Sequence, residues 1–512
     1  MKVDIMRTIE IMDTTLRDGE QTNGVSFTDK EKLNIAKQLL IEVKVERIEV
    51  GSARVSEGEF NSAKKIMAWG REQNLLDKIE ILGFIDNGQS LTWINEAGGK
   101  RINFLCKGSL RQLEGQLRKT PEEHIADIKA NVKIADDFGI TANIYLEDWS
   151  NGMRQSPEYV ELLISELQKT SIQRFMLPDT LGIMYPKETY RYCKSIIEKF
   201  PNLHFDFHAH NDYDLAVANS NAAASAGIHG VHTSVNGLGE RTGNATLSSI
   251  IPCLHDHLHI QTSVQEMQLN KISKLVETIS GIRVAANMPI IGSNVFTQTA
   301  GVHADGDKKG NLYFNDLMPE RFGRVRKYAL GKTSGKANIE KNLQELGLEL
   351  DNDEMLLVTK KVVELGDKKE SITTEDLPYI VREVLGQLDK EEKVSIENYS
   401  VCHAKGLKPV ATLSLRINGS TYEETSAGDG QYDAVMNALK KIYEPLNVNI
   451  PRLLDYLVTI PPGGKTDALV ESIITWESPK CIFKTRGLDS DQTAAAIKAT
   501  VRMLNIIHDQ QE

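Results

Sequence analysis

Short apolar runs alternate with longer amphipathic segments along the first half of the chain. Each run has the length and composition of a buried β-strand, and start signals for helices lie between the runs, at Thr28-x-x-Glu31, Thr120-Pro121 and Ser156-Pro157. The eight runs are Ile9–Met12, Arg47–Val50, Ile79–Phe84, Arg101–Leu105, Thr141–Leu146, Arg174–Leu177, His204–His208 and Gly230–Val235. Eight strand–helix units within about 250 residues predict an α/β fold, a (β/α)8 TIM barrel. A doubly wound sheet is disfavoured because TTLRDGEQ, after the first run, is not a Gly-rich phosphate turn.

The pattern changes twice beyond the barrel. Helical periodicity dominates residues 265–392, except in the irregular, Gly-rich stretch NMPIIGSNVFTQTAGVHADGDKKGNLYF. After residue 393, three strand-like runs and a helix occur twice, with Ala434 and Ala494 as equivalent points 60 residues apart. We therefore predict a catalytic barrel over 1–264, helical linker subdomains over 265–392 that contribute to the active site, and an α+β regulatory domain of two βββα units over 393–512.

Composition narrows the class of protein. The 512 residues include 60 Lys and Arg against 71 Asp and Glu, a net charge of −11, which repels polyanions and disfavours nucleic acid as a partner. The five cysteines are scattered, and neither an apolar leader at the start nor a run of about 18 apolar residues is present. We expect a cytoplasmic protein without membrane association, whose anionic ligands need a local basic site.

Polar residues gather where the predicted barrel strands end, which is where active sites lie in this fold. His208 and His210 are two residues apart at a strand end, so both side chains face the barrel interior. With the Asp18 carboxylate and the Asn244 amide oxygen they form a mixed nitrogen and oxygen site for Mn²⁺, Mg²⁺ or Zn²⁺ acting as a Lewis acid. The alternative is a pair of structural histidines that are only hydrogen-bonded.

Arg17, next to Asp18, places a fixed cation beside this site. Together they suit an anionic 2-oxo acid whose keto oxygen and carboxylate the metal chelates, while Arg17 stabilises the alkoxide formed on attack at the carbonyl. A purely structural alternative is an ion pair of Arg17 with Glu49 or Glu147.

Three segments carry a specific resemblance. MDTTLRDGEQTNGVSF, HFDFHAHNDYDLAVANSNAAASAG and VNGLGERTGNA, followed by TAGVHADG, resemble the signatures of the metal-dependent, aldolase-like family that includes the isopropylmalate, homocitrate and citramalate synthases. The resemblance covers nearly the full chain. It implies a Claisen-type condensation, in which the enolate of acetyl-CoA attacks a metal-bound 2-oxo acid and water then cleaves the thioester to free CoA.

The resemblance also implies roles for individual residues. It places the metal on Asp18, His208, His210 and Asn244, and it makes Arg17 the group that polarises the keto oxygen. Thr180 then binds the substrate carboxylate, and Tyr313 lines the acetyl-CoA side. Acid/base work falls to Glu147 and His303, the latter reaching across from a neighbouring subunit; which of the two removes the methyl proton stays open.

The inward residues Leu82, Leu105 and Tyr145 of strands three to five are the expected walls of the substrate pocket. Isopropylmalate synthases tend to carry a small residue at the position of Tyr145, and a tyrosine there leaves room for little more than a methyl group. We therefore expect pyruvate as the substrate and (R)-citramalate as the product, with 2-oxoisovalerate and isopropylmalate as the alternative, because an apolar pocket discriminates one methylene by only about 1–3 kcal/mol.

The resemblance further implies a homodimer with a branched-chain amino-acid effector, isoleucine in similar citramalate synthases, bound in the C-terminal domain. The positions that match the effector site are Tyr432, Asp433, Leu453, Tyr456, Thr466 and Gln492. Ser490 departs from the expected pattern, so a dimer-forming domain without a ligand stays an alternative. Two other hypotheses are disfavoured: a retro-aldol lyase would lack residues 394–512, and a non-catalytic sensor would not keep the polar set of the barrel.

Overall fold

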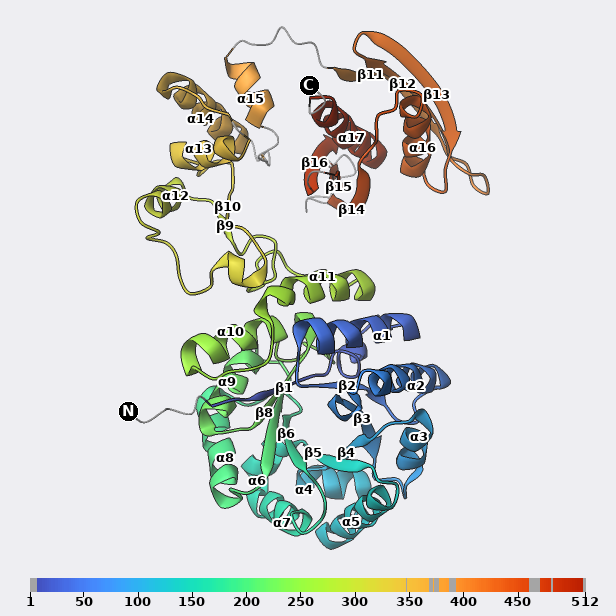
Figure 1. Ribbon diagram of the computed structural model, residues 1–512, viewed down its shortest axis with the longest axis vertical. Helices are drawn as coiled ribbons and strands as arrows, with labels where there is room; N and C mark the ends of the chain where they lie inside the picture. The colour runs from blue at the N-terminus through green and yellow to red at the C-terminus, as the bar shows by residue number, and fades with distance from the viewer. Residues whose placement is uncertain are drawn as a thin grey trace. The chain divides into compact units, whose positions relative to one another are not determined.

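The computed structural model describes residues 7–346, 348–367, 372, 377–385, 393–459, 470–479 and 482–509. The chain divides into two compact units, one made of Met1–Thr297 and Phe314–Lys327 and the other of Gln298–Tyr313 and Tyr328–Glu512. It therefore passes from one unit to the other three times (Figure 1). Among the described residues, no helix combines the length and the apolar composition that a membrane crossing requires.

The first unit contains a closed barrel of eight parallel strands, as the sequence predicts. The strand ends differ from the predicted ones by no more than two residues. The strands are β1 (Glu10–Asp13), β2 (Arg47–Ser52), β3 (Ile79–Phe84), β4 (Arg101–Lys107), β5 (Thr141–Glu147), β6 (Arg174–Asp179), β7 (His204–Ala209) and β8 (Gly230–Thr233).

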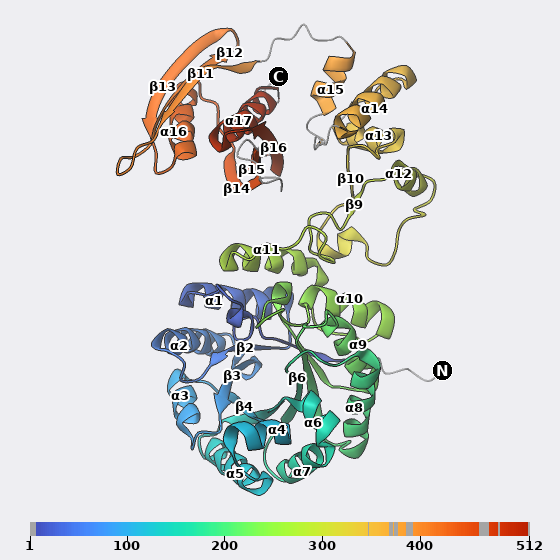
Figure 2. The ribbon, with the colours of Figure 1, turned by 180° about the vertical axis from the view of Figure 1, so that it is seen from behind.

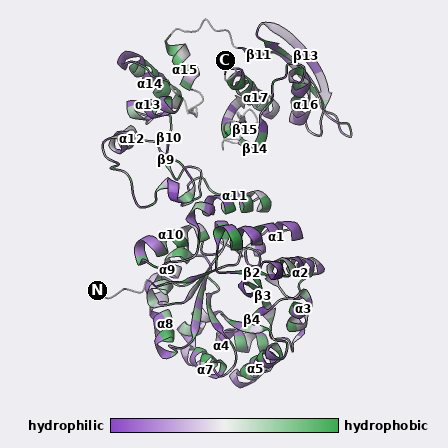
Figure 3. Cartoon of the chain, viewed as in Figure 1, coloured by the Kyte–Doolittle hydropathy of each residue, from purple (hydrophilic) through white to green (hydrophobic). Residues whose placement is uncertain are grey.

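Helices surround these strands, and Figure 2 shows them from the other side. They are α1 (Asp29–Lys37), α2 (Glu57–Glu72), α3 (Gln89–Ala97), α4 (Leu110–Gln112), α5 (Pro121–Asp137), α6 (Trp149–Gln155), α7 (Pro157–Leu167), α8 (Pro186–Lys199), α9 (Ala216–Ala226), α10 (Leu247–Leu258) and α11 (Leu269–Ser280). Hydrophobic and hydrophilic residues alternate along them, as expected of helices with one face on a core (Figure 3).

The helix start signals are confirmed at two of the three positions. Thr28 and Thr120 each form a capping box with the glutamate three residues later. Ser156 is an exception: it lies between α6 and α7, and its side chain makes no cap hydrogen bond to α7, although Pro157 does occupy the first turn. Its hydroxyl instead accepts the Leu110 amide and donates to the Gly152 carbonyl. The Ser156 hydroxyl is thus used in one local contact and one with a distant segment, and it does not cap α7.

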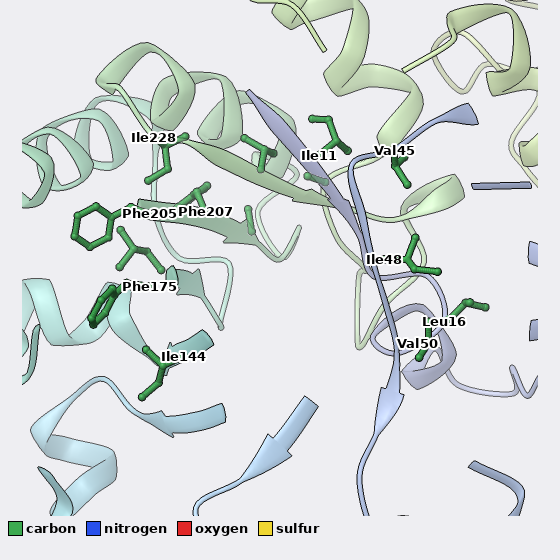
Figure 4. Close-up of a cluster of buried hydrophobic side chains, with 14 of the residues drawn as sticks. Ile11, Leu16, Val45, Ile48, Val50, Ile144, Phe175, Phe205, Phe207 and Ile228 are labelled. Atoms are coloured by element: carbon green, nitrogen blue, oxygen red, sulfur yellow. The ribbon is translucent and has the colours of Figure 1, made fainter. Parts of the chain in front are cut away.

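The main hydrophobic core lies between the strands and the helices. Figure 4 shows Ile48, Ile144, Phe175 and Phe207, one from each of β2, β5, β6 and β7, and all four are fully buried. The residues next to them point into the barrel instead. There a separate, smaller apolar cluster consists of Met12, Leu82, Leu105, Tyr145 and Met176.

The second unit begins with short elements and three helices and ends in two βββα units. The short strands are β9 (Thr297–Gln298) and β10 (Lys327–Tyr328), and the helices are α12 (Gly301–Lys308), α13 (Lys336–Glu345), α14 (Asn352–Asp367) and α15 (Leu377–Val384). Helix α12 is a correction, because its residues were expected to be irregular. Its sequence, GVHADGDK, contains two glycines, which weaken the helical signal.

The two βββα units follow the predicted order. The first has β11 (Val394–Cys402), β12 (Val410–Ile417), β13 (Ser420–Ala427) and α16 (Gln431–Tyr443), and the second has β14 (Arg452–Thr459), β15 (Val470–Glu477), β16 (Ile482–Asp489) and α17 (Gln492–Asp509). Each sheet is antiparallel and has three strands. Leu439 of α16, Trp476 of β15 and Met503 of α17 belong to one hydrophobic cluster, so the two units share a core.

Candidate active site

Asp18, His208 and His210 meet inside the barrel. The Asp18 Oδ2 atom lies 3.1 Å from His208 Nε2 and 3.7 Å from His210 Nε2, and the two Nε2 atoms are 3.4 Å apart. All three side chains are buried. Among the described residues, they form the group of His, Cys, Asp and Glu side chains whose ligand atoms lie close enough together, within 4.8 Å of one another, to hold one metal ion. The alternation of strand β7 places both imidazoles on one side, as predicted from their spacing.

Asn244 reaches the same place from the loop after β8. This loop folds back along the end of β7, where His210 and Asn244 form a β-bridge. Gly243, directly before it, has φ +85°, and a Cβ there would lie 1.8 Å from the Gly237 carbonyl oxygen, so the turn requires glycine. The Asn244 Oδ1 atom is buried without a hydrogen-bond partner among the described residues, whereas its Nδ2 donates to the Leu238 carbonyl.

The charge states of these groups suit a cation. Burial raises the pKa of Asp18, but the charge of Arg17 and the hydrogen bond with His208 outweigh it and hold that pKa well below the usual range. Burial also lowers the pKa of His208, and it lowers the pKa of His210 to about 4. Both imidazoles are then neutral near pH 7, which is the form that binds metal.

A divalent metal fits this donor set. Two neutral imidazoles, an ionised carboxylate and an unpartnered amide oxygen are the ligand types that Mn²⁺, Mg²⁺ and Zn²⁺ accept. The Asp18 Oδ1 atom is likewise buried without a hydrogen-bond partner among the described residues. Buried polar atoms without partners are costly, and a bound cation removes that cost.

Arg17 contacts the carboxylates of both Asp18 and Glu49. Its Nη1 lies 3.3 Å from Asp18 Oδ2, and its Nε donates to Glu49 Oε2 at 2.5 Å. Burial lowers the pKa of Arg17, but the carboxylates of Glu49 and Asp18 outweigh it and raise that pKa above the ordinary value. The ion pair with Glu49 that the structural alternative predicts is therefore present, and it holds the guanidinium beside the Asp18 cluster, while the role of Arg17 toward a substrate stays a prediction. Glu147, the other partner considered for Arg17, instead bonds Lys107.

A buried lysine supports the loop that carries Arg17 and Asp18. Lys32 of α1 is fully buried; its Nζ contacts Glu20 Oε2 at 2.6 Å and Glu59, and it lies 3.3 Å from the Leu16 carbonyl oxygen. A buried cation with two carboxylates and a carbonyl is well compensated. These contacts tie both sides of the Arg17–Asp18 pair to the first helix.

The predicted pocket residues lie together inside the barrel. Leu105, Tyr145 and Met176 are neighbours across β4, β5 and β6, and Leu82 belongs to the same cluster. The Tyr145 ring stands edge to face against His208, with centroids 6.1 Å apart, and the Arg17 guanidinium lies 5.8 Å from the ring centroid. An apolar wall therefore adjoins the polar cluster.

Thr180 and Glu147 lie at the carboxyl ends of neighbouring strands. The Thr180 hydroxyl accepts a hydrogen bond from the Asp148 amide at 2.9 Å. Glu147 is paired in register with Lys107 of β4, whose Nζ lies 2.5 Å from Glu147 Oε2. The barrel thus brings seven predicted residues together, Arg17, Asp18, Leu82, Leu105, Tyr145, His208 and His210, and Glu147 follows two residues beyond Tyr145 at the end of β5.

His303 and Tyr313 belong to the second unit, and they lie against each other. Their ring centroids are 4.2 Å apart, and the His303 Nδ1 atom lies 3.1 Å from the Gln298 side-chain oxygen. His303 is on helix α12 rather than in an irregular loop. Gly306, one turn later, leaves room for Tyr313, since a Cβ there would lie 2.5 Å from the ring.

The predicted effector residues are only partly gathered. Tyr432 and Tyr456 are in ring contact at 5.2 Å, and the Tyr432 hydroxyl bonds Thr500 at 2.6 Å. Asp433 accepts the Asp429 amide, and Leu453 is partly exposed on β14. Gln492 is the first residue of α17, and Thr466 lies outside the described residues.

Sequence reasoning missed several polar residues that line the barrel interior. They are Arg47, Glu80, Asn103, Lys107, Asn143, Asp206 and His232, and all seven are buried. Strand alternation carried a signal for some of them: His232 follows outward Val231, and Lys107 lies two residues beyond inward Leu105. Their partners come from distant strands, and a single sequence does not reveal these pairs.

Family models of known proteins match successive parts of this chain. The HMGL-like family model matches residues 8–276, the homocitrate synthase post-HMGL domain-like model matches 290–370, and the LeuA allosteric (dimerisation) domain model matches 371–508. The chain belongs to the HMGL-like family.

Its curated relatives include enzymes with two different names. The (R)-citramalate synthase of Methanocaldococcus jannaschii is 32% identical over 501 residues, 98% of this chain and 99% of the relative. The probable 2-isopropylmalate synthase of Methanopyrus kandleri is 34% identical over 500 residues, 97% of this chain and 98% of the relative. A solved HMG-CoA lyase from Bacillus subtilis has 22% identity and a TM-score of 0.45, over 54% of this chain and 95% of that one.

Proposed function

We propose that the protein is an acyltransferase that condenses acetyl-CoA with pyruvate to give (R)-citramalate and CoA. The observation that carries the choice of substrate is the apolar wall of Leu82, Leu105 and Tyr145 beside Arg17 and the Asp18 cluster. Full-length relatives that are citramalate and 2-isopropylmalate synthases support the reaction class.

Different residues of the barrel have different roles in the proposed reaction. A bound divalent metal supplies Lewis acidity toward the carbonyl of the 2-oxo acid. Arg17 holds a fixed positive charge where negative charge develops on the keto oxygen, and Glu49 keeps that guanidinium in place. Thr180 offers a hydroxyl to the substrate carboxylate. The methyl group of the oxo acid fits against Leu82, Leu105 and Tyr145.

Proton transfer needs one base and one acid. The acetyl-CoA methyl group loses a proton, its carbon forms a bond to the keto carbon, and the resulting alkoxide takes up a proton. Water then cleaves the thioester C–S bond and releases the CoA thiol. Glu147 and His303 are the two candidates for the acid/base groups; Glu147 is held by Lys107 at the barrel mouth.

The test is release of free thiol from acetyl-CoA with pyruvate, 2-oxoisovalerate and 2-oxoglutarate assayed side by side, after reconstitution with Mn²⁺, Mg²⁺ or Zn²⁺. We expect turnover with pyruvate and dependence on one of these metals. Turnover with 2-oxoisovalerate alone would identify a 2-isopropylmalate synthase, the second candidate, which the 34% identical relative favours. Absence of thiol release with all three acids would contradict the synthase proposal.

For the C-terminal domain we propose dimer formation and binding of a branched-chain amino acid. The match of the LeuA allosteric (dimerisation) domain model to residues 371–508 supports both. Light scattering measures the mass in solution, and the thiol assay with added isoleucine, leucine or valine measures inhibition. We expect a dimer and inhibition by isoleucine. A monomeric mass would contradict the proposed dimer, and equal rates with all three amino acids would contradict the proposed effector.

A further inference from the structure

A buried chain of three side chains leads from the pocket wall toward the opposite end of the barrel. The Tyr145 hydroxyl lies 3.1 Å from His232 Nδ1, and His232 Nε2 lies 3.2 Å from Asp206 Oδ2. Tyr145, His232 and Asp206 are at most 2% exposed. Beyond Asp206 the chain ends on the guanidinium of Arg47, which also bonds Glu80.

The direction of these hydrogen bonds follows from their ends. Asp206 is ion-paired with Arg47, so it is a carboxylate and accepts the proton of His232 Nε2. A neutral imidazole with its proton on Nε2 has a lone pair on Nδ1, and Nδ1 therefore accepts the Tyr145 hydroxyl proton. The tautomer of His232 is thus determined by Asp206, and the orientation of the Tyr145 hydroxyl by His232.

Arg17 and Glu49 also lie near the Tyr145 hydroxyl, but a guanidinium only donates, so Arg17 cannot accept the hydroxyl proton in place of His232. Glu49 Oε2 is 3.4 Å away, at the limit of a hydrogen bond, and it already receives Arg17 Nε at 2.5 Å. The other oxygen of Glu49 receives Asn103 Nδ2 at 2.7 Å. Ring packing adds to the restraint, because His232 stands edge to face on Tyr145 with centroids 5.5 Å apart.

We infer that His232 is a specificity-determining positioning residue: by fixing the Tyr145 ring it limits the length of the 2-oxo acid that the pocket accepts. This inference rests on the proposed function and deepens it. A buried hydroxyl that loses its acceptor is costly, so the ring moves toward other partners and opens space beside Leu105. Longer side chains then enter a pocket that the native ring keeps short.

The experiment compares His232→Leu, which removes the acceptor at similar volume, with His232→Asn, which retains an acceptor near the position of Nδ1. Specificity is the ratio of kcat/KM for pyruvate to kcat/KM for 2-oxobutanoate, which is longer by one methylene. We expect this ratio to fall about tenfold in His232→Leu, the order of discrimination that one methylene provides, and to stay within about threefold of wild type in His232→Asn. His229→Asn is the matched control, because that histidine accepts the Phe205 amide instead.

Tyr145→Phe provides an independent route if His232→Leu does not fold. It keeps the ring but removes the hydroxyl that His232 accepts, so it should lower the ratio in the same direction, and adding His232→Leu should then change the ratio little further. Metal content is measured for every variant. An unchanged ratio in folded, metal-loaded His232→Leu overturns the inference, and so does loss of metal, which would assign His232 to the cluster.

The two proposals fail separately in this design. Wild-type turnover with an unchanged ratio in the variants contradicts only the role of His232. If the wild type releases no thiol with any oxo acid, the proposed function is wrong, and the ratio of dissociation constants for the two acids, measured by calorimetry, still decides whether His232 restricts the pocket.

Discussion

The two faces of the barrel strands differ sharply although they are made of the same segments. Phe175 and Ile144 point outward into an apolar core that the helices complete, whereas Met176 and Tyr145, one residue along, point inward. Inside, the apolar cluster lies between two polar regions, the network of Arg47, Asp206 and Glu80 and the cluster of Asp18 with the histidines.

Burial therefore has a different consequence on the outward face of the strands than on the inward face. Outward side chains lose water and gain close packing, which stabilises the fold. Inward charges lose water too, and they are tolerated because each has a partner or, at the Asp18 cluster, a ligand to hold. We therefore expect inward changes to alter chemistry or cost large amounts of stability, and conservative outward changes to have small, purely structural effects.

The largest effect is expected at the metal cluster. His208→Ala removes a ligand, and turnover should fall about a thousandfold or more, because a Lewis acid contributes several kcal/mol and each 1.4 kcal/mol is tenfold. Thiol release and metal content by mass spectrometry measure this. The exposed histidine His257 supplies the control, His257→Ala, in which both stay at the wild-type level. Full activity with full metal content in His208→Ala would refute the ligand assignment.

The inner charge network should respond to Arg47→Met with a loss of about 3–5 kcal/mol in the free energy of unfolding. Arg47 pairs with Asp206, Glu80 and Glu10, and its removal leaves the first two carboxylates buried without their cation. Urea titration measures the loss. Arg54→Met is the matched surface control, since that arginine pairs with Asp86 and is 43% exposed; a loss as small as the control's would show that the network is not what stabilises the interior.

A smaller effect depends on pH. His124 is 2% exposed and accepts the Lys107 amide at its Nε2, and burial lowers its pKa to about 4. Near it, Asp127 raises that pKa while Lys119 and Lys107 lower it. The unfolded chain binds the proton near pH 6.5, so stability is fully present above 6.5 and is lost as the pH falls toward 4, by about 2–3 kcal/mol.

His124→Gln should flatten this slope, since glutamine keeps an acceptor and does not titrate. The measurement is the free energy of unfolding of both proteins at several pH values between 7 and 4. Equal slopes for the two proteins would mean that His124 is not the group responsible.

The smallest effect is expected on the outer face. Ile144→Val removes one buried methylene from the outward core and should cost about 1 kcal/mol in the free energy of unfolding. Its neighbour Tyr145 faces the pocket, so kcat/KM per folded molecule should stay at the wild-type value. A change in substrate preference in Ile144→Val would show that the two faces are not independent.

Much of the fold could be predicted because its signals are local. Apolar runs gave all eight barrel strands, and the pair His208 and His210 pointed inward by strand alternation alone. Capping residues Thr28 and Thr120 act within four residues of sequence. The metal-like cluster could also be predicted, because strand ends in a barrel converge whatever the sequence of the helices.

The rest depends on contacts between distant segments. Arg47 meets Asp206 across 159 positions of sequence, and Tyr145 meets His232 across 87. A lone arginine or histidine in a strand carries no mark of its partner. Ser156 failed as a cap for the same reason, since its hydroxyl accepts the amide of Leu110, the first residue of α4, 46 positions earlier in the sequence. His303 and Tyr313 were each predicted, but their contact was not.

The chain crosses from one unit to the other three times, and this affects how the protein responds to proteolysis. The segment Phe314–Lys327 belongs to the first unit, where Arg321 bonds both Asp256 and Glu266, and it is flanked on both sides by chain of the second unit. One cut between residues 298 and 313 leaves a carboxyl-terminal fragment that still contains this anchored segment. After such a cut, this segment still holds the carboxyl-terminal fragment on the rest of the first unit through noncovalent contacts, and separating the two fragments requires the Arg321 ion pairs to break.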